Sequence, residues 1–122
     1  MNSVYAFALA GALSLAGAGA ALAHADLASA DPAAGASLKT APTAISITFT
    51  EEVEPKFSSI EVLDGSGKRL DDGKAHTAPD NEKLLSVGLK PLAPGTYKVI
   101  WHATAADDSH KTKGSYEFTV KP

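Results

Sequence analysis

The sequence predicts an all-β fold, a small antiparallel sandwich, and two observations carry this prediction. Hydrophobic residues recur at every second position in several short segments, which is typical of strands with one buried face. Turn-forming residues separate these segments about every ten residues, as in sandwiches with short connections. No stretch after residue 23 has hydrophobic residues at helical spacing. A chain of 122 residues is long enough for one such domain.

The first predicted strand is the clearest, because Ile45, Ile47 and Phe49 alternate with serine and threonine. The longest places Tyr97, Val99, Trp101 and Ala103 on one face and polar residues mostly on the other. Predicted strands span, in order, residues 45–49, 59–62, 84–87, 97–104 and 116–120. The sequence DGSG at 64–67 predicts a turn. Residues 71–83 are polar and irregular, which predicts a long loop or a weak hairpin.

A proline–glycine turn leads directly into the longest predicted strand. The segment Leu92-x-Pro94-Gly95-x-Tyr97 resembles a tyrosine corner, in which a tyrosine hydroxyl bonds to backbone a few residues upstream in Greek-key sandwiches. The alternative is an ordinary turn followed by a core tyrosine. The position of the turn at the start of the strand favours the corner, and with it a Greek-key arrangement.

Residues 1–23 differ from the rest of the chain. They contain no Asp, Glu, Lys or Arg and consist mostly of small and apolar residues. They end in Ala21-Leu22-Ala23, the small-x-small pattern that signal peptidase accepts. We therefore expect a cleaved secretory signal peptide over 1–23 and a mature domain over 24–122. The alternative, an uncleaved membrane anchor, is disfavoured because the segment is rich in glycine and alanine and weakly hydrophobic.

Charge and cysteine content exclude several classes of partner and ligand. The net charge of −3 argues against nucleic acid, because phosphate binding needs a basic face, and it suits a cation. The sequence has no cysteine, so an exported domain must be stable without disulfides. It also lacks the thiolates that commonly bind Zn²⁺ or Cu(I). No Ser-His-Asp triad, phosphate-binding loop or paired-carboxylate motif is present, and the sequence predicts no catalytic residues.

The first candidate ligand is His24, which cleavage after Ala23 would place at the N-terminus. An N-terminal histidine offers its α-amine and an imidazole nitrogen to one ion and closes a chelate ring. Nitrogen donors in a tetragonal plane suit Cu(II), which binds most tightly among the divalent ions of its row. The alternative is that a histidine follows the cleavage site by chance.

Two further groups of residues carry possible ligands. In an extended segment Asp108 and His110 would point the same way, so that a carboxylate and an imidazole converge on one ion; the alternative is a solvated loop. Glu51, Glu52 and Glu54 follow the strand over 45–49, and at least two of them are expected to be solvated. One carboxylate there could bind a metal weakly or support a ligating histidine. The remaining histidines are expected to lie on the surface: His76 and His102.

Several segments of the mature chain, taken in order, match one family. They are His24-Ala25-x-Leu27-x-x-x-x-Pro32-x-x-Gly35, Ile47-x-Phe49-Thr50-Glu51 with Phe57-Ser58, Pro94-Gly95-Thr96-Tyr97-x-Val99-x-Trp101, and Asp108-x-His110-x-x-x-Gly114-x-x-x-Phe118-x-Val120. Through them the chain resembles the CopC family of periplasmic copper-resistance proteins over essentially all of residues 24–122. The resemblance implies a Greek-key sandwich or barrel of about seven strands, immunoglobulin-like or cupredoxin-like.

The resemblance also implies a site for one Cu(II) ion. By motif its ligands would be the amine and imidazole of His24, Asp108 and His110, with Glu51 as a weak ligand or a support. Because the segment before the Asp-x-His motif is one residue longer than expected, Asp107 is the alternative to Asp108. Some family members carry a methionine-rich Cu(I) loop, but the only methionine here is Met1, so no separate Cu(I) site is expected.

The leading functional hypothesis is a periplasmic copper carrier or buffer that is not an enzyme. It would bind Cu(II) and pass it to a membrane partner, for which a CopD-like inner-membrane copper transporter is the candidate. No nucleic-acid partner and no lipid insertion after cleavage are expected. The alternatives are a copper-dependent oxidative enzyme built on an N-terminal histidine, and an immunoglobulin-like interaction module that binds no metal.

Overall fold

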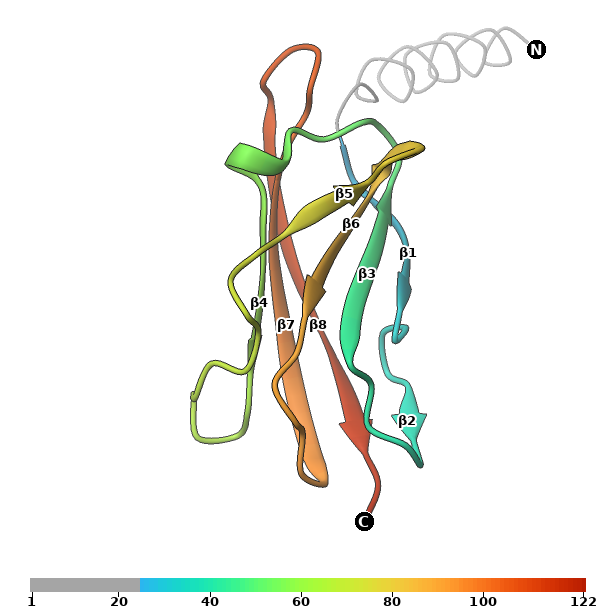
Figure 1. Cartoon of the computed structure of the whole chain (residues 1–122), viewed down its shortest axis with the longest axis vertical. Coiled ribbons are helices and arrows are strands. Elements are labelled where there is room, and N and C mark those ends of the chain that lie inside the picture. The colour runs from blue at the N-terminus through green and yellow to red at the C-terminus, as the bar shows by residue number, and fades with distance from the viewer. Residues whose placement is uncertain (1–24) are drawn as a thin grey trace, which may run out of the picture.

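The structure is a computed structural model, and it describes residues 25–122 (Figure 1). The predicted signal peptide over 1–23 and the candidate ligand His24 lie outside the described residues. Among residues 25–122, no helix is both apolar enough and long enough to span a membrane.

The described chain forms two four-stranded sheets that pack face to face. One sheet has the order β1-β3-β6-β5 and the other the order β2-β8-β7-β4. The strands are β1 Leu27–Asp31, β2 Ser37–Leu38, β3 Ala44–Phe49, β4 Ser59–Leu63, β5 His76–Ala78, β6 Asn81–Gly88, β7 Gly95–Thr104 and β8 Lys111–Val120. A short 3₁₀ helix, η2, spans Pro55–Phe57 between β3 and β4. This is the strand arrangement of immunoglobulin-like Greek-key sandwiches, as the sequence predicts.

The core lies between the two sheets and is built by the predicted alternation. The odd-numbered residues of β3 and the inward residues of β7 are buried, and the residues between them are exposed or half-buried. The two sheets contact each other through Phe49 and Trp101, whose rings meet edge to face with centroids 5.3 Å apart. Each strand therefore contributes one apolar face, and sheet packing supplies the stability that disulfides give to other exported domains.

The tyrosine corner is present. The Tyr97 hydroxyl donates a hydrogen bond to the carbonyl oxygen of Ala93, at the turn that precedes β7. The Tyr97 ring also stacks on Phe118 of β8, with centroids 5.5 Å apart. The start of the longest hairpin, β7–β8, is fixed in this way at the end of the sandwich where the chain terminates (Figure 1).

The structure contains elements that the sequence did not predict. Strands β1 and β2 lie before the first predicted strand, and β8 begins at Lys111 rather than at residue 116. Residues 71–83 are not a plain loop, because β5 pairs with β6 across a tight turn in the weak hairpin named as the second alternative. The described residues form eight strands, close to the expected number of about seven, and the two shortest, β2 and β5, are two and three residues long.

The outer edge of β4 is closed by the segment that follows it. The Leu70 amide donates to the Val62 carbonyl, and the Val62 amide donates to the buried carboxylate of Asp71 at 3.0 Å. Arg69 donates to both oxygens of that carboxylate, at 2.9 and 3.0 Å. Burial disfavours the charged form, but the hydrogen bonds from Arg69 and Val62 outweigh it and hold the pKa of Asp71 below its ordinary value of 3.8.

Because the pKa of Asp71 is lower in the folded state than in the unfolded chain, its charged form stabilises the fold above the unfolded pKa. That stabilisation is lost as the pH falls below about 4 and through the folded pKa. We expect Asp71→Asn to flatten the decrease of the free energy of unfolding in this acidic range, measured by urea denaturation at several pH values. The exposed control Asp80→Asn should keep the wild-type slope; equal slopes in all three proteins would contradict the prediction.

Candidate metal centre

The segments that carry the predicted ligands within residues 25–122 lie at one end of the sandwich, opposite the C-terminus (Figure 1). The loop between β7 and β8, the segment after β3, the β5–β6 turn and the start of the described chain all lie at this end. Backbone hydrogen bonds tie them together: the Ala106 amide donates to the Glu52 carbonyl and the Val53 amide donates to the Glu82 carbonyl. Residues far apart in sequence are therefore held in one place.

The loop between β7 and β8 carries the Asp-x-His motif in a closed turn. The Ala105 amide donates to the His110 carbonyl, and the Ser109 amide donates back to the Ala105 carbonyl. Ser109 has a φ of 60°, the left-handed conformation that turns favour. The prediction that residues 108–110 are extended is thus wrong, because the loop closes on itself within six residues.

Asp108 and His110 nevertheless stay close together for a different reason. The Asp108 carboxylate accepts a hydrogen bond from the His110 amide at 2.9 Å, which is an Asx turn. This bond uses one carboxylate oxygen and anchors the carboxylate at the base of His110. The Asp107 carboxylate accepts a hydrogen bond from the amide of the next residue, Asp108, at 2.7 Å. All three residues are exposed at the tip of the loop.

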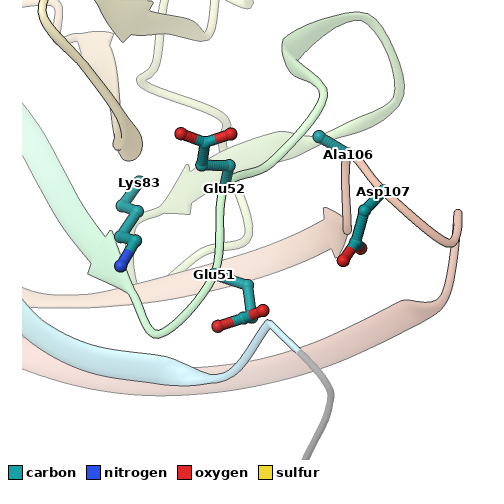
Figure 2. A pocket seen from close by; sticks show the side chains of 5 residues that line it. All are labelled: Glu51, Glu52, Lys83, Ala106 and Asp107. Carbon is teal, nitrogen blue, oxygen red and sulfur yellow. The ribbon is translucent and has the colours of Figure 1, made fainter.

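The three acidic residues after β3 have different surroundings. Glu51 is half-buried, and Glu52 is exposed. They line an open pocket of about 260 Å³ together with Asp107, Lys83 and Ala106. Figure 2 shows the two glutamates leaving the chain in opposite directions, with Glu51 and Asp107 on the same side. Glu54 instead caps η2 by accepting from the Lys56 amide at 3.4 Å, so it has a local structural role.

The start of the described chain is anchored between the two candidate segments. Ala25 is fully buried, and its carbonyl accepts a hydrogen bond from the Thr112 hydroxyl, two residues after His110. Asp26 exchanges two hydrogen bonds with Thr50: its amide donates to the hydroxyl at 3.0 Å, and its carbonyl accepts from the amide at 2.8 Å. Thr50 immediately precedes Glu51, so these two bonds join the start of the described chain to the residue before Glu51.

Residues 25–122 do not by themselves bring together three His, Cys, Asp or Glu side chains in a group able to hold a metal ion. The two other histidines are exposed and lie elsewhere. His76 contacts the Lys74 carbonyl through Nδ1 at 3.1 Å, and His102 faces outward from β7 opposite Lys113. The described part of the candidate centre is therefore one imidazole with nearby carboxylates, and these oxygen and nitrogen donors suit a divalent cation.

Sequence reasoning missed the residues that hold this end of the molecule together. Thr112 and Thr50 bind the first two described residues, yet a lone threonine in a strand gives no sequence signal for such a role. Thr104 is buried, and its hydroxyl donates to the Phe57 carbonyl at 2.9 Å, which fixes η2 against β7. Only the pairing of strands identifies these contacts.

Comparison with known proteins agrees with the fold. Residues 27–121 match the model of the CopC domain. The protein YobA of Escherichia coli K12 is 41% identical over 100 residues, which cover 81% of this chain and 80% of YobA. The copper transport protein CutJ of Bacillus subtilis is 34% identical over 99 residues, which cover 80% of this chain and 18% of CutJ.

Solved structures give the same result. The crystal structure of CopC from Methylosinus trichosporium OB3b superposes with a TM-score of 0.76 at 34% identity, covering 81% of this chain and 95% of that one. PcoC of Escherichia coli, described as a methionine-rich copper resistance protein, superposes with a TM-score of 0.70 at 32% identity, covering 81% and 100% of the two chains. Because the CopC domain model matches residues 27–121 and relatives at 30% identity or more are matched over most of both chains, the chain is a member of the CopC family.

Proposed function

We propose that the mature protein binds one Cu(II) ion through the α-amine and imidazole of His24, the carboxylate of Asp108 and the imidazole of His110. The observation that carries this proposal is the anchoring of Ala25 beside Thr112. Consecutive Cα atoms lie about 3.8 Å apart, so residue 24 starts within one peptide link of a fixed, fully buried residue. That residue is hydrogen-bonded to the strand that begins directly after His110.

The Asx turn supports the role of Asp108. One of its oxygens is used by the His110 amide, which leaves the other to bind the ion beside the imidazole. Glu51 lies at the opposite side of the N-terminal segment, one residue after Thr50, and we place it as a weak ligand or as a hydrogen-bond acceptor for a ligating histidine. The carboxylates gathered at this end also attract a cation.

Asparagine substitutions test which aspartate binds the ion. Asparagine keeps the oxygen that accepts the backbone hydrogen bond, so Asp108→Asn and Asp107→Asn preserve the loop and each remove one charge. We expect Asp108→Asn to weaken Cu(II) binding by about tenfold or more, and Asp107→Asn by less than about threefold. Competition titration against a chelator of known affinity measures both. The reverse order would assign the site to Asp107, and two unaffected variants would remove both from the site.

We place the protein in the periplasm as a carrier or buffer of Cu(II) that acts in copper resistance or homeostasis. Four donors around the ion fill a plane, which favours storage and transfer over chemistry at an open position. A membrane copper transporter of the CopD kind is the partner we propose to receive the ion. The share of CutJ that this chain matches is consistent with such a domain acting beside a larger transport protein.

Two measurements separate this function from its alternatives. Copper-loaded protein incubated with a reductant and a polysaccharide should release no oxidised sugars; their release would identify an oxidative enzyme. The spectrum of bound Cu(II) should change in His110→Ala, whereas an interaction module that binds no metal would show no specific Cu(II) spectrum in either protein. An intact mass of the exported protein, with and without copper, should give a chain beginning at His24 with one ion.

A further inference from the structure

Within residues 25–122, one edge of strand β8 has no strand partner over more than half of its length. β8 pairs with β7 from Lys111 to Val120, but on its other side β2 pairs only with Thr119 and Val120. The last backbone bonds on that side are from the Gly35 amide to the Glu117 carbonyl, at 2.7 Å, and from the Thr119 amide to the Ala36 carbonyl, at 2.8 Å. From Lys111 to Tyr116, no other strand within residues 25–122 lies beside this edge.

The backbone groups on this open edge follow from the strand geometry. Amides and carbonyls alternate in direction along a strand, so residues at every second position point to the same side. The backbone N–H and C=O groups of Glu117 and Thr119 point away from β7. Those of Ser115, Lys113 and Lys111 therefore do so as well. The edge presents three successive sets of donors and acceptors. The far edge of the same sheet differs, because residues 69–71 close β4 as described above.

An apolar cleft lies beside this edge on its inner side. It measures about 540 Å³ and runs between β1 and β8. Its walls include Leu27 and Ala30 from β1, Trp101 from β7, and Gly114 and Tyr116 from β8. The hydroxyl oxygen of Tyr116 is buried there without a hydrogen-bond partner among residues 25–122. The cleft thus combines an apolar wall with an unused polar group, as binding sites commonly do.

The outer side of the same edge is basic. Lys111 and Lys113 project outward from β8, and His102 of β7 lies directly opposite Lys113. The acidic Glu117 lies at the closed end of the edge, where Gly35 bonds to it. Lysines on an edge strand also oppose pairing with a second copy of the same edge, because like charges would face each other.

We propose that this edge binds an extended segment of another polypeptide in which apolar and acidic residues alternate. The segment would add a strand to β8 through the backbone groups of Lys111, Lys113 and Ser115. Its side chains alternate between the two faces, so every second one enters the apolar cleft and the others face the lysines. The inference is independent of copper, since none of these groups is a proposed ligand, and it brings a partner segment to the residue after His110.

The test uses the copper-free mature protein and two synthetic ten-residue peptides, one alternating valine and glutamate and the other valine and lysine. Trp101 is the only tryptophan and lines the cleft, so its fluorescence reports occupation of the site. We expect the glutamate peptide to bind about tenfold more tightly than the lysine peptide. Isothermal titration supplies the stoichiometry of one peptide per chain.

Two variants and a matched control locate the binding. Ser115→Pro removes an amide that faces the open edge and is not used by the β7–β8 ladder, so the fold tolerates it. Lys113→Glu reverses the charge on the outer side. Each should weaken binding of the glutamate peptide by about tenfold, the effect of one lost backbone hydrogen bond or one reversed contact. Lys90→Glu makes the same charge change outside the edge and should leave binding unchanged.

Several results would overturn the proposal. Equal binding of the two peptides would remove the charge selectivity, and unchanged binding by folded Ser115→Pro would remove the strand addition. Self-association in sedimentation that the peptide does not reverse would assign the edge to a second copy of the chain. Binding of a small apolar dye in the cleft with no binding of either peptide would make it a small-molecule site. Copper affinity is measured separately, so these results leave the metal centre untouched.

Discussion

Adding one alanine before His24 is expected to weaken Cu(II) binding by about a hundredfold or more, equivalent to about 3 kcal/mol of binding free energy. The added residue converts the α-amine of His24 into an amide, and it removes the amine–imidazole chelate ring of that residue while leaving the imidazole in place. The fold should be unaffected, because the first described residue, Ala25, keeps its buried position and its bond to Thr112. Chelator competition measures the affinity, and the Cu(II) spectrum reports the loss of a nitrogen donor.

A matched control adds the same alanine after Pro122. The C-terminus lies at the opposite end of the sandwich, so this extension has the same size and should not change the affinity (Figure 1). His24→Ala completes the set, since it retains an α-amine but loses the imidazole. Equal affinity of the wild type and the N-terminal extension would show that the amine is not a ligand. The site would then depend on imidazoles and carboxylates alone.

The predicted part of the fold is the part in which burial follows strict alternation. Residues 45–49 and 97–104 each face the core on one side and water on the other, so the alternation of apolar and polar side chains indicates a strand. β1 was not predicted, because its register relative to β3 shifts between Leu27 and Ser29 and this breaks the alternation of inward and outward side chains. The first half of β8 escaped because Lys111–Ser115 are polar or glycine, and this part of the strand is defined by its backbone pairing to β7 rather than by burial.

In the candidate site too, the sequence identified candidate residues but not how the chain arranges them. The Asp-x-His motif identified Asp108 and His110 as neighbours, but through an extended segment; the structure instead closes the loop and joins them through an Asx turn. Residue type and spacing alone do not distinguish Glu54, which caps η2, from Glu51, which follows the Thr50 that binds Asp26; only the family resemblance selects Glu51. Which acid faces the site depends on the turn after β3, and that turn is set by backbone bonds to Thr104 and Ala106.

The second large effect is expected from Gly114→Ala. Gly114 lies directly opposite Trp101 in the β7–β8 ladder, and the indole covers its backbone. A Cβ atom at position 114 would lie 2.6 Å from Cζ2 of Trp101 and 2.9 Å from its Nε1. The indole cannot move toward the other sheet, because its ring meets Phe49 there with centroids 5.3 Å apart, and turning it into the cleft between β1 and β8 would give up that contact. We expect the free energy of unfolding to fall by about 3 kcal/mol.

Gly65→Ala is the matched control, because a Cβ atom at position 65 meets nothing within 4 Å and no positive φ opposes it. Its free energy of unfolding should change by less than about 0.5 kcal/mol. Urea denaturation measures both variants, and near-ultraviolet circular dichroism, which reports on the single tryptophan, should change only in Gly114→Ala. If the two variants were equally stable, Trp101 would not pack on Gly114.

Phe49, which contacts the indole, directly precedes Thr50, which binds Asp26. Displacing the indole should therefore also loosen the anchor of Asp26. Gly114→Ala should then lower the Cu(II) affinity although residue 114 is not a proposed ligand.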